Sequence, residues 1–521
     1  MKQRVDARLG VEAVADPASF AGPKEQSKGH CADGVLADRL DQRIRVVGEY
    51  IDELFGGPRP ILARRPDQHA SERGDPVHCR QCGWRRFGVA VASVHQARRL
   101  AQQGREGFAG HGIGQHGHEF VEVEFSPRPS AHGARRYRVR ADPTIGVMLV
   151  DLRSLLGDLG APEGDGLFVE QRRADEGWVF GGALALTGRA DRPPVAAPSQ
   201  VAPRIAAVGD LLGIDAFRLL STRAEYGGLT RRSPQSCGGA TRLMATRDGW
   251  LALSLARPDD RELLPALFES DFDGAAHADP WITIEHLAST RAIEALVERG
   301  ALLGLAIASI GETALRWAPD GVPAVRWSPS GVDRPQRDRP VVADLSSLWA
   351  GPVCAHLLGV SGFEVVKVES KGRPDGARQG PPGFFAALHA GHRQLGLDFS
   401  DARDLSALRR VVGAADVVIE ASRPRALEQL GITAKPTQVW VSITGHGRSG
   451  PGRNRIAFGD DAAVAGGLVA YDEQGPCFLA DAIADPLTGM TAALAARRAW
   501  ATGEGGVLDV AMARVAAWFA R

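Results

Sequence analysis

Cationic and glycine-rich loops gather in the second half of the chain, and most follow a short run of β-branched residues. Ligands bind open parallel sheets at the carboxyl ends of the strands, so such loops would meet at one edge. Their cationic groups and backbone N–H groups could hold a polyanion such as a nucleotide diphosphate. An ordinary solvated surface is the alternative. The candidate contacts are Ala350, Gly351, Pro352, Lys371, His392, Arg393, Arg423, Arg425, Gly445 and Gly447.

The glycine spacing in these loops does not match the known phosphate-binding fingerprints. The stretch GHGRSG at 445–450 has G-x-G-x-x-G spacing and follows a predicted strand, but no helix pattern follows it. The chain also lacks a G-x-x-x-x-G-K-[ST] sequence. The loops therefore indicate a basic ligand site without a recognised nucleotide motif.

A single carboxylate, Asp485, stands in the stretch AIADPLTG at 482–489, directly before an alanine-rich run that predicts a helix. Aspartate is common at the N-cap of a helix, where its side chain accepts backbone hydrogen bonds. A carboxylate can also act as a nucleophile in covalent catalysis. Small neighbours leave room for a substrate, and the N–H groups of a helix start could stabilise an anionic intermediate. The two roles are compatible.

The elements that would position these residues alternate between strand and helix from residue 341 onward. The strand runs lack strict alternation of apolar and polar residues, as strands buried on both faces do. We therefore predict an α/β fold with an open, doubly wound, mostly parallel sheet. The predicted strands are residues 341–345, 363–369, 416–421 and 439–444.

The preceding region has a mixed pattern that predicts a smaller α+β domain. Residues 241–256 predict a hairpin with a turn at Arg247-Asp248-Gly249, and helical spacing follows. Residues 318–340 are rich in proline, glycine and charge, which is typical of a linker. We therefore divide the chain into residues 1–147, a region at 148–330 and an α/β half at 331–521.

The first 147 residues show no sustained period of a helix or strand, except in short runs at 42–54, 88–94 and 120–125. We predict either a poorly ordered extension or translated sequence upstream of a start at Met148. Cys79 and Cys82 have the spacing of half a zinc site. No second pair at a recognised spacing completes it, so we predict no metal.

The overall composition is that of an ordinary globular protein without a charged bias. The 521 residues include 62 Lys+Arg and 62 Asp+Glu, which gives no general attraction to nucleic acid or an anionic membrane. The sequence predicts neither a transmembrane helix nor a secretory signal. Six cysteines do not form a disulfide framework. We expect a cytoplasmic protein.

Five stretches, in the correct order over residues 341–521, resemble the family III CoA-transferases. This is the formyl-CoA and carnitine-CoA transferase superfamily, which is related to the α-methylacyl-CoA racemases. The resemblance implies an enzyme that moves CoA from an acyl-CoA to a carboxylic acid, in a homodimer of interlocked chains. The stretches are VVADLSSLWAGPVCAHLLGVSGFEVVKVES, FFAALHAGHRQLGLDFS, ADVVIEASRPRALEQLGI, WVSITGHGRSGP and DAIADPLTGM.

The resemblance assigns the role of nucleophile to Asp485, which has the sequence context of the family's catalytic aspartate. Its carboxylate would attack the thioester, giving a mixed anhydride and then an aspartyl-CoA thioester. An aspartate with the reference pKa of about 3.9 is ionised at pH 7, as this reaction requires. CoA would be a substrate contacted by the loop residues above, with no permanently bound cofactor.

The sequence departs from the family pattern at three places. His389-Ala390-Gly391-His392-Arg393 replaces an Asn-Arg-Gly-Lys-Arg run, Ser370 stands where arginine is usual, and Glu420-Ala421-Ser422 replaces Glu-Asn-Phe. These changes weaken the individual CoA contacts and leave a non-catalytic CoA-binding subunit as an alternative. A racemase is a second alternative. Racemases use the histidine of a Gly-His-Asp sequence, which is Gly459-Asp460-Asp461 here, so this alternative lacks its base.

The two halves stand in an unusual order, because family members begin with the α/β half. Residues 178–203 parallel residues 462–486, since both have a small-residue helix, a turn and a Pro-containing strand. In the earlier copy, Pro203 takes the place of Asp485. The chain therefore resembles a permuted or fused enzyme with one competent aspartate, or one whose site a partner chain completes.

Overall fold

The computed structural model describes residues 123–125, 137–139, 147–160, 167–270, 279–313, 323–422 and 424–521. The runs at 42–54 and 88–94, the Cys79/Cys82 pair and Arg423 lie outside the described residues. Strand β1 (Val123–Phe125) falls within the run at 120–125 and pairs antiparallel with β2 (Tyr137–Val139). The division of the chain into three parts stays a prediction.

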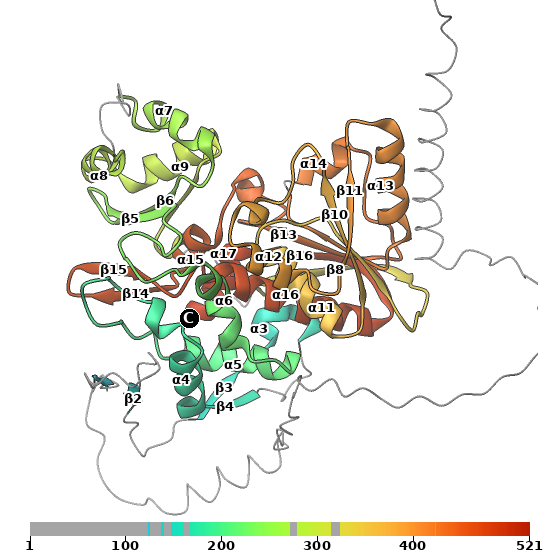
Figure 1. Cartoon of the computed structure of the whole chain (residues 1–521), viewed down its shortest axis with the longest axis horizontal. Helices are drawn as coiled ribbons and strands as arrows, with labels where there is room; N and C mark the ends of the chain where they lie inside the picture. The colour runs from blue at the N-terminus through green and yellow to red at the C-terminus, as the bar shows by residue number, and fades with distance from the viewer. Residues whose placement is uncertain are drawn as a thin grey trace, which may run out of the picture. The chain divides into compact units, whose positions relative to one another are not determined.

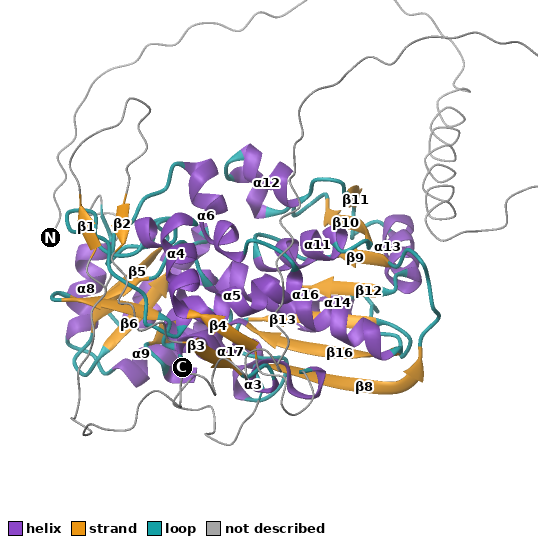
Figure 2. Cartoon of the chain, turned by 90° about the horizontal axis from the view of Figure 1, so that it is seen from below, coloured by secondary structure: helices purple, strands orange, loops and turns teal. Residues whose placement is uncertain are grey.

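The largest sheet in the described residues has seven strands, in the order β11-β10-β9-β12-β13-β16-β8 (Figure 2). Neighbouring strands are parallel except at the edge, where β8 is antiparallel to β16. With β9 as the first strand, the parallel strands have the order of a doubly wound fold. This confirms the predicted α/β fold with an open, mostly parallel sheet. The strands are β8 (Val325–Asp333), β9 (Val341–Asp344), β10 (Glu364–Ser370), β11 (Arg393–Leu397), β12 (Val417–Glu420), β13 (Val439–Thr444) and β16 (Glu504–Ala511).

The sequence does not predict three of these strands. The residues of β11, RQLGL, include no β-branched side chain, and β16 contains two glycines. Strand β8 lies inside the stretch 318–340 that has the composition of a linker. Strand β8 is at the edge of the sheet and contains one proline and one glycine. An edge strand tolerates both, because one side of its backbone needs no partner. The structure therefore places residues 325–333 in the sheet.

The strand order reverses between β9 and β12, and this is where doubly wound sheets bind their ligands. The residues that follow β9, 345–349, form the switch-point loop, which leads into helix α11 (Ala350–Val360). Its first backbone N–H, that of Leu345, donates to the carbonyl oxygen of Ile419 in β12 at 2.9 Å. Loop and sheet are thus joined at the reversal.

Helix α16 (Ala484–Thr502) packs against α11 and against strands β13 and β16 (Figure 1). Gly489 permits this approach, because a Cβ there would lie 2.6 Å from the carbonyl oxygen of Ala350. The start of α16 is therefore held beside the start of α11. The other helices of this half are α12 (Pro382–Leu388), α13 (Ala402–Ala414), α14 (Pro424–Gln429), α15 (Gly459–Gly466) and α17 (Met512–Ala520).

Between α15 and α16, strands β14 (Val469–Asp472) and β15 (Gly475–Phe478) form an antiparallel pair.

The region before residue 330 packs into the same core. Ile205, Leu220 and Leu487 belong to one buried hydrophobic cluster. Its helices are α3 (Arg153–Leu156), α4 (Gln171–Phe180), α5 (Val201–Leu212), α6 (Ala216–Gly227), α7 (Leu264–Phe268), α8 (Trp281–Ser289) and α9 (Ile293–Leu303). Among the described residues, every helix is too short or too polar to cross a bilayer.

Two small antiparallel sheets accompany these helices. Strands β3 (Val147–Val150) and β4 (Leu167–Glu170) pair with each other. Strands β5 (Thr241–Ala245), β6 (Trp250–Ser254) and β7 (Ala306–Ser309) form the second sheet. The pairing of β5 with β6 confirms the predicted hairpin.

Candidate active site

Asp485 is the second residue of α16 and is partly exposed, whereas Ala484 and Pro486 on either side are buried. The N-cap position belongs to Ile483, and no side chain caps this helix. The backbone N–H of Asp485 donates to the carbonyl oxygen of Ala482 at 2.9 Å. Asp485 therefore does not serve as the N-cap, and its carboxylate remains available for other contacts.

The turn that leads into α16 has a strained backbone. Ala480 and Ala482 have φ angles of 49° and 41°, in the left-handed region that residues with a Cβ rarely adopt. Each such residue costs on the order of 1–3 kcal/mol and persists only when its surroundings hold it. Between them lies Asp481, which is completely buried. We call residues 480–482 the strained turn.

Gly459, the first residue of α15, lies directly against the Asp485 carboxylate. A Cβ at position 459 would be 2.4 Å from Oδ2 of Asp485 and 2.4 Å from the carbonyl oxygen of Ala482. The backbone N–H of Gly459 hydrogen-bonds to Asp485. A residue without a side chain is needed here, because the backbone itself contacts the acid.

Four aspartates and one arginine make up the charged centre of the site. Asp460 and Asp461, in the first turn of α15, and Asp481 are all buried. Arg223, from α6, donates from Nε to Oδ2 of Asp481 at 2.8 Å and from Nη2 to Oδ1 at 2.5 Å. An arginine from the region before residue 330 therefore contributes to the site within a single chain.

Burial raises the pKa of Asp485 to about 7; Arg223 lowers it, and the charges of Asp460 and Asp481 raise it further. Burial likewise raises the pKa of Asp460 to about 6, against hydrogen bonds from Ser236 and Thr241. The expectation that Asp485 is ionised at pH 7 like an ordinary aspartate is thus wrong. The pKa of its carboxyl group is raised mainly by burial, and the neighbouring acids add to this effect.

Burial also raises the pKa of Asp461 well above its usual range. One of its carboxyl oxygens accepts a hydrogen bond from the Phe458 N–H at 2.9 Å, and the other is buried without a hydrogen-bond partner. Asp461 therefore caps the start of α15 through the Phe458 N–H, and its burial favours the neutral form.

Several predicted ligand contacts lie at the carboxyl edge of the sheet. Ala350, Gly351 and Pro352 form the first turn of α11 and are buried there. Gly445 and Gly447 follow β13, and Arg425 is in the first turn of α14. Lys371 follows β10 and is exposed, with its Nζ 3.2 Å from Oδ2 of Asp404. The structure brings these residues to the edge that the sequence predicts.

His392 and Arg393 lie elsewhere, because they precede and begin β11, which is parallel to β10. Arg393 pairs with Glu364, the first residue of β10, at 2.9 Å. The Nδ1 atoms of His392 and His389 are 3.3 Å apart, and burial lowers the pKa of both to about 4. His392 is therefore neutral at pH 7 and does not supply the cation that its position suggests.

The switch-point loop is anchored by Lys367, a fully buried lysine in β10. Its Nζ donates to the carbonyl oxygen of Ser346 and, at 3.0 Å, to Oδ2 of Asp375. The other oxygen of Asp375 accepts from the Leu348 N–H at 2.8 Å, where φ is 70°. The run FEVVKVE predicts only a strand, so sequence reasoning misses this role of Lys367.

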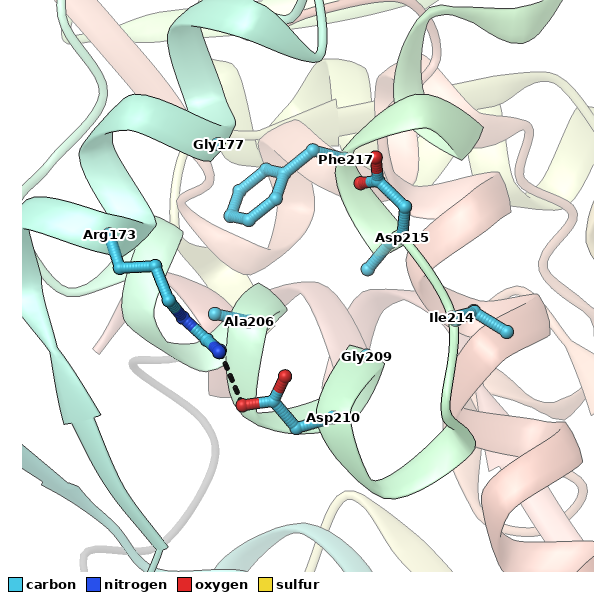
Figure 3. A pocket seen from close by; sticks show the side chains of 9 residues that line it. Arg173, Gly177, Ala206, Gly209, Asp210, Ile214, Asp215 and Phe217 are labelled. Carbon is cyan, nitrogen blue, oxygen red and sulfur yellow. Dashed lines mark hydrogen bonds and ion pairs between the residues drawn. The ribbon is translucent and has the colours of Figure 1, made fainter. Parts of the chain in front are cut away.

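A cavity of about 200 Å³ lies between α4, α5 and α6 (Figure 3). Arg173 and Asp210 form an ion pair on its wall. Its lining includes neither Asp485 nor the groups around it, so it is separate from the charged centre. The residues around it are Arg173, Gly177, Ala206, Gly209, Asp210, Ile214, Asp215, Ala216 and Phe217. No cluster of three metal-ligating side chains is present among the residues described.

Sequence reasoning finds Asp485 but misses the groups that control it. Asp481 begins the stretch DAIADPLTGM and Asp460 takes the place of the racemase histidine, yet neither position indicates an effect on Asp485. Nothing in the sequence around Arg223 indicates a role in the site, because its helix has the pattern of an ordinary amphipathic helix. The acids lie in the first turns of helices or next to them, and only the fold brings them together.

Known proteins are similar to the C-terminal part of the chain. The model of the family described as CoA-transferase family III matches residues 340–521. An acyl-CoA transferase of Fusarium pseudograminearum is 31% identical over 26% of this chain and 35% of its own length. A succinyl-CoA–D-citramalate CoA-transferase of Chloroflexus aurantiacus is 28% identical over 32% of this chain and 47% of its own length.

A solved structure of a CaiB/BaiF family protein from Brucella suis is also similar. It has 28% sequence identity and a TM-score of 0.33, and the match covers 36% of this chain and 55% of that one. The chain spans about a third to a half of the length of the curated relatives described here. The segment that matches CoA-transferase family III, residues 340–521, contains Asp485 and the parallel strands.

Proposed function

We propose that the protein is a CoA-transferase and that Asp485 is its nucleophile. The placement of Asp485 supports this most strongly: it is partly exposed and lies in the segment that matches the family. Gly489, four residues later on the same face of α16, touches Ala350 at the start of α11. A CoA thioester bound at the switch-point loop would therefore meet the Asp485 carboxylate.

The reaction proceeds through two kinds of covalent intermediate on Asp485. A carboxylate oxygen attacks the thioester carbonyl carbon, the C–S bond breaks, and CoA leaves as the thiolate. The thiolate attacks the side-chain carbonyl of the anhydride and releases the donor acid, which leaves an aspartyl-CoA thioester. An acceptor carboxylate reverses these steps and departs as the new acyl-CoA. The backbone N–H of Gly459, which hydrogen-bonds to Asp485, stabilises the negative charge.

Acids with two carboxyl groups are the first substrates to test. Relatives of this chain carry the names of succinyl-CoA–D-citramalate and succinyl-CoA:glutarate CoA-transferases. We extend to this protein the use of succinyl-CoA as donor and such acids as acceptors. A homodimer and a cytoplasmic location, expected from the sequence, are further parts of the proposal.

We use an acceptor acid in which both oxygens of each carboxyl group are heavy oxygen. We expect it to transfer one labelled oxygen atom to the side chain of Asp485. In the proposed steps the acceptor oxygen that attacks the Asp485 side chain stays there when the new thioester forms. The labelled peptide 481–490 would be found by mass spectrometry after a few turnovers with an acyl-CoA. An enzyme that transfers CoA directly between substrates leaves this peptide unlabelled.

Two variants act as controls for this experiment. Asp485→Ala should form no adduct with acyl-CoA and hydroxylamine, and should show no CoA transfer. Asp401→Asn changes an acid that caps α13 through the N–H groups of Arg403 and Asp404. It should label and turn over as the unmodified enzyme does. Unlabelled Asp485 in an active enzyme would contradict the mechanism and leave the transferase activity in place.

We expect kcat for CoA transfer to rise with pH and to level off above a midpoint near 7. Burial raises the pKa of Asp485 to about 7, and only its ionised form is a nucleophile. Well below the midpoint, kcat should fall about tenfold per pH unit. Asp460→Asn should move the midpoint down, because Asp460 raises the pKa of Asp485. A pH profile at saturating substrate checks both results, and a flat profile from pH 5 would contradict the assignment.

A racemase is the second candidate, and the position of Asp460 favours it. Asp460 stands where the related racemases have their histidine, and burial raises its pKa to about 6, close to that of Asp485. Two acids with such pKa values could exchange a proton at the α-carbon of an acyl-CoA. Incubation in deuterated water without an acceptor acid distinguishes the two functions. A racemase incorporates deuterium at the α-carbon, and a transferase does not.

A further inference from the structure

Arg223 joins three features of the site that the proposed reaction does not account for. Its guanidinium binds both oxygens of the fully buried Asp481 and lies 5.2 Å from the centre of the Trp349 ring. Asp481 is the middle residue of the strained turn that precedes Asp485. Trp349 is the last residue of the switch-point loop and is 3% exposed. One side chain thus contacts both the strained turn and the switch-point loop.

The strained turn needs an external restraint. Ala480 and Ala482 keep left-handed backbone angles without the freedom of glycine, so the surroundings must hold them there. The Thr187 hydroxyl accepts a hydrogen bond from the Ala480 N–H at 3.0 Å. On the other side, the fork of Arg223 fixes the Asp481 carboxylate in both direction and rotation. The turn is therefore held by residues from before residue 330.

We propose that Arg223 is the positioning residue of Asp485. By clamping Asp481 and stacking on Trp349, it fixes the strained turn and orients the nucleophile toward the switch-point loop. This inference rests on the proposed function of Asp485 and assigns a role to a residue outside the segment that matches the family. It also gives the helices before residue 330 a part in catalysis, because α6 delivers the guanidinium.

Arg223 has a second, separable effect through its charge. The groups that face Asp485 are Asp460 and Asp461 of α15, Asp481 of the strained turn, and Arg223 of α6. The Cys237 thiol near the same acids is neutral, since burial raises its pKa. Arg223 is the one cation among these groups and lowers the pKa of Asp485. Removal of its charge therefore raises that pKa, whatever happens to the geometry.

Substitutions at position 223 separate the geometric effect from the effect of charge. Arg223→Lys keeps the charge but loses the fork and the planar stack. It should lower kcat and leave the midpoint of the pH–rate profile close to that of the unmodified enzyme. Arg223→Met loses both, so kcat should fall about 100-fold, as for a displaced nucleophile, and the midpoint should move to higher pH. An Arg223→Met enzyme with unchanged kcat and midpoint would overturn the proposal.

A double variant keeps the test valid if Arg223→Met does not fold. Asp481 would then be buried without a partner, which is strongly destabilising. Arg223→Met with Asp481→Asn removes that charge and should restore the melting temperature, but not kcat. Recovery of kcat as well would show that Arg223 only neutralises Asp481. Arg218→Met, which removes an exposed arginine paired with Glu225 on the same helix, should leave kcat unchanged.

The ionisation of Asp485 can also be followed without any turnover. The difference in unfolding free energy between each background and its Asp485→Asn derivative, measured against pH, reports the pKa of Asp485. The pH at which this difference levels off marks the pKa of Asp485 in the folded protein. It should be higher in the Arg223→Met background, or in the double variant. If the unmodified protein transfers no CoA but this shift is observed, the proposed function fails and the coupling of Arg223 to Asp485 stands. If this pH does not change, the coupling of Arg223 to Asp485 is itself contradicted.

Discussion

Asp485→Asn is expected to stabilise the fold above pH 7 while lowering kcat by about 10⁴-fold or more, as loss of a nucleophile does. The pKa of Asp485 is about 7 in the fold, against about 3.9 for an unfolded aspartate. At pH values between these two pKa values, the folded state binds more protons than the unfolded state. The stability of the fold is therefore greatest below about pH 4 and falls until about pH 7. The asparagine side chain does not ionise, so the variant does not lose this stability as the pH rises.

The size of the gain depends on how far the pKa is displaced. Each unit is worth about 1.4 kcal/mol, so the gain at pH 8 should be a few kcal/mol, reduced by the partial exposure of Asp485. At about pH 4 the two proteins should unfold at similar denaturant concentrations. Guanidinium unfolding at both pH values checks this, with Asp401→Asn as the control for one lost acid. A variant that is destabilised at both pH values would show that the carboxylate supports the fold.

Gly459→Ala is also expected to lower activity strongly, by about 100-fold, although alanine is usually a mild replacement. The added Cβ would be 2.4 Å from both the Asp485 Oδ2 and the Ala482 carbonyl oxygen, so the backbone and the carboxylate must shift. A displacement on the order of 1 Å can cost about 100-fold in rate. Overpacking should also destabilise the fold by about 1–3 kcal/mol. Steady-state kinetics and thermal unfolding together measure the two effects.

Gly396→Ala is the matched control for this replacement. Gly396 lies in β11, and a Cβ there would meet only the Lys371 side chain, at 3.8 Å. Its activity and melting temperature should stay close to those of the unmodified protein. If Gly459→Ala retains full activity, the Asp485 carboxylate does not need the position observed here.

The sheet could be predicted from sequence where its strands are buried on both faces. The runs that became β9, β12 and β13 consist mainly of β-branched residues, since no face of these strands meets water. Strands β11, β16 and β8 carry no such pattern. β8 is recognisable only through its pairing with β16, residues about 180 positions away, so local propensity contains no sign of it.

The site could be predicted only as far as its individual residues have recognisable contexts. Asp485 stands in a distinctive stretch, but its pKa is set by Asp460, Asp481 and Arg223, which the fold brings together from separate elements. The same limit applies to His392, whose neutral state results from burial beside His389. A sequence identifies the groups that can react, while their charge at a given pH is a property of the assembled core.

The pairing of Arg223 with Asp481 spans 258 positions of the chain, and this has a consequence for biosynthesis. During translation, α6 leaves the ribosome long before the strained turn exists. Strand β16, which joins β13 to β8, is made later still. The nascent chain therefore carries an unpaired guanidinium while residues 224–480 are made, and its sheet is still unfinished when Asp481 appears. Chaperones that shield apolar surface would act in this interval, and the charged centre around Asp485 is assembled only after it ends.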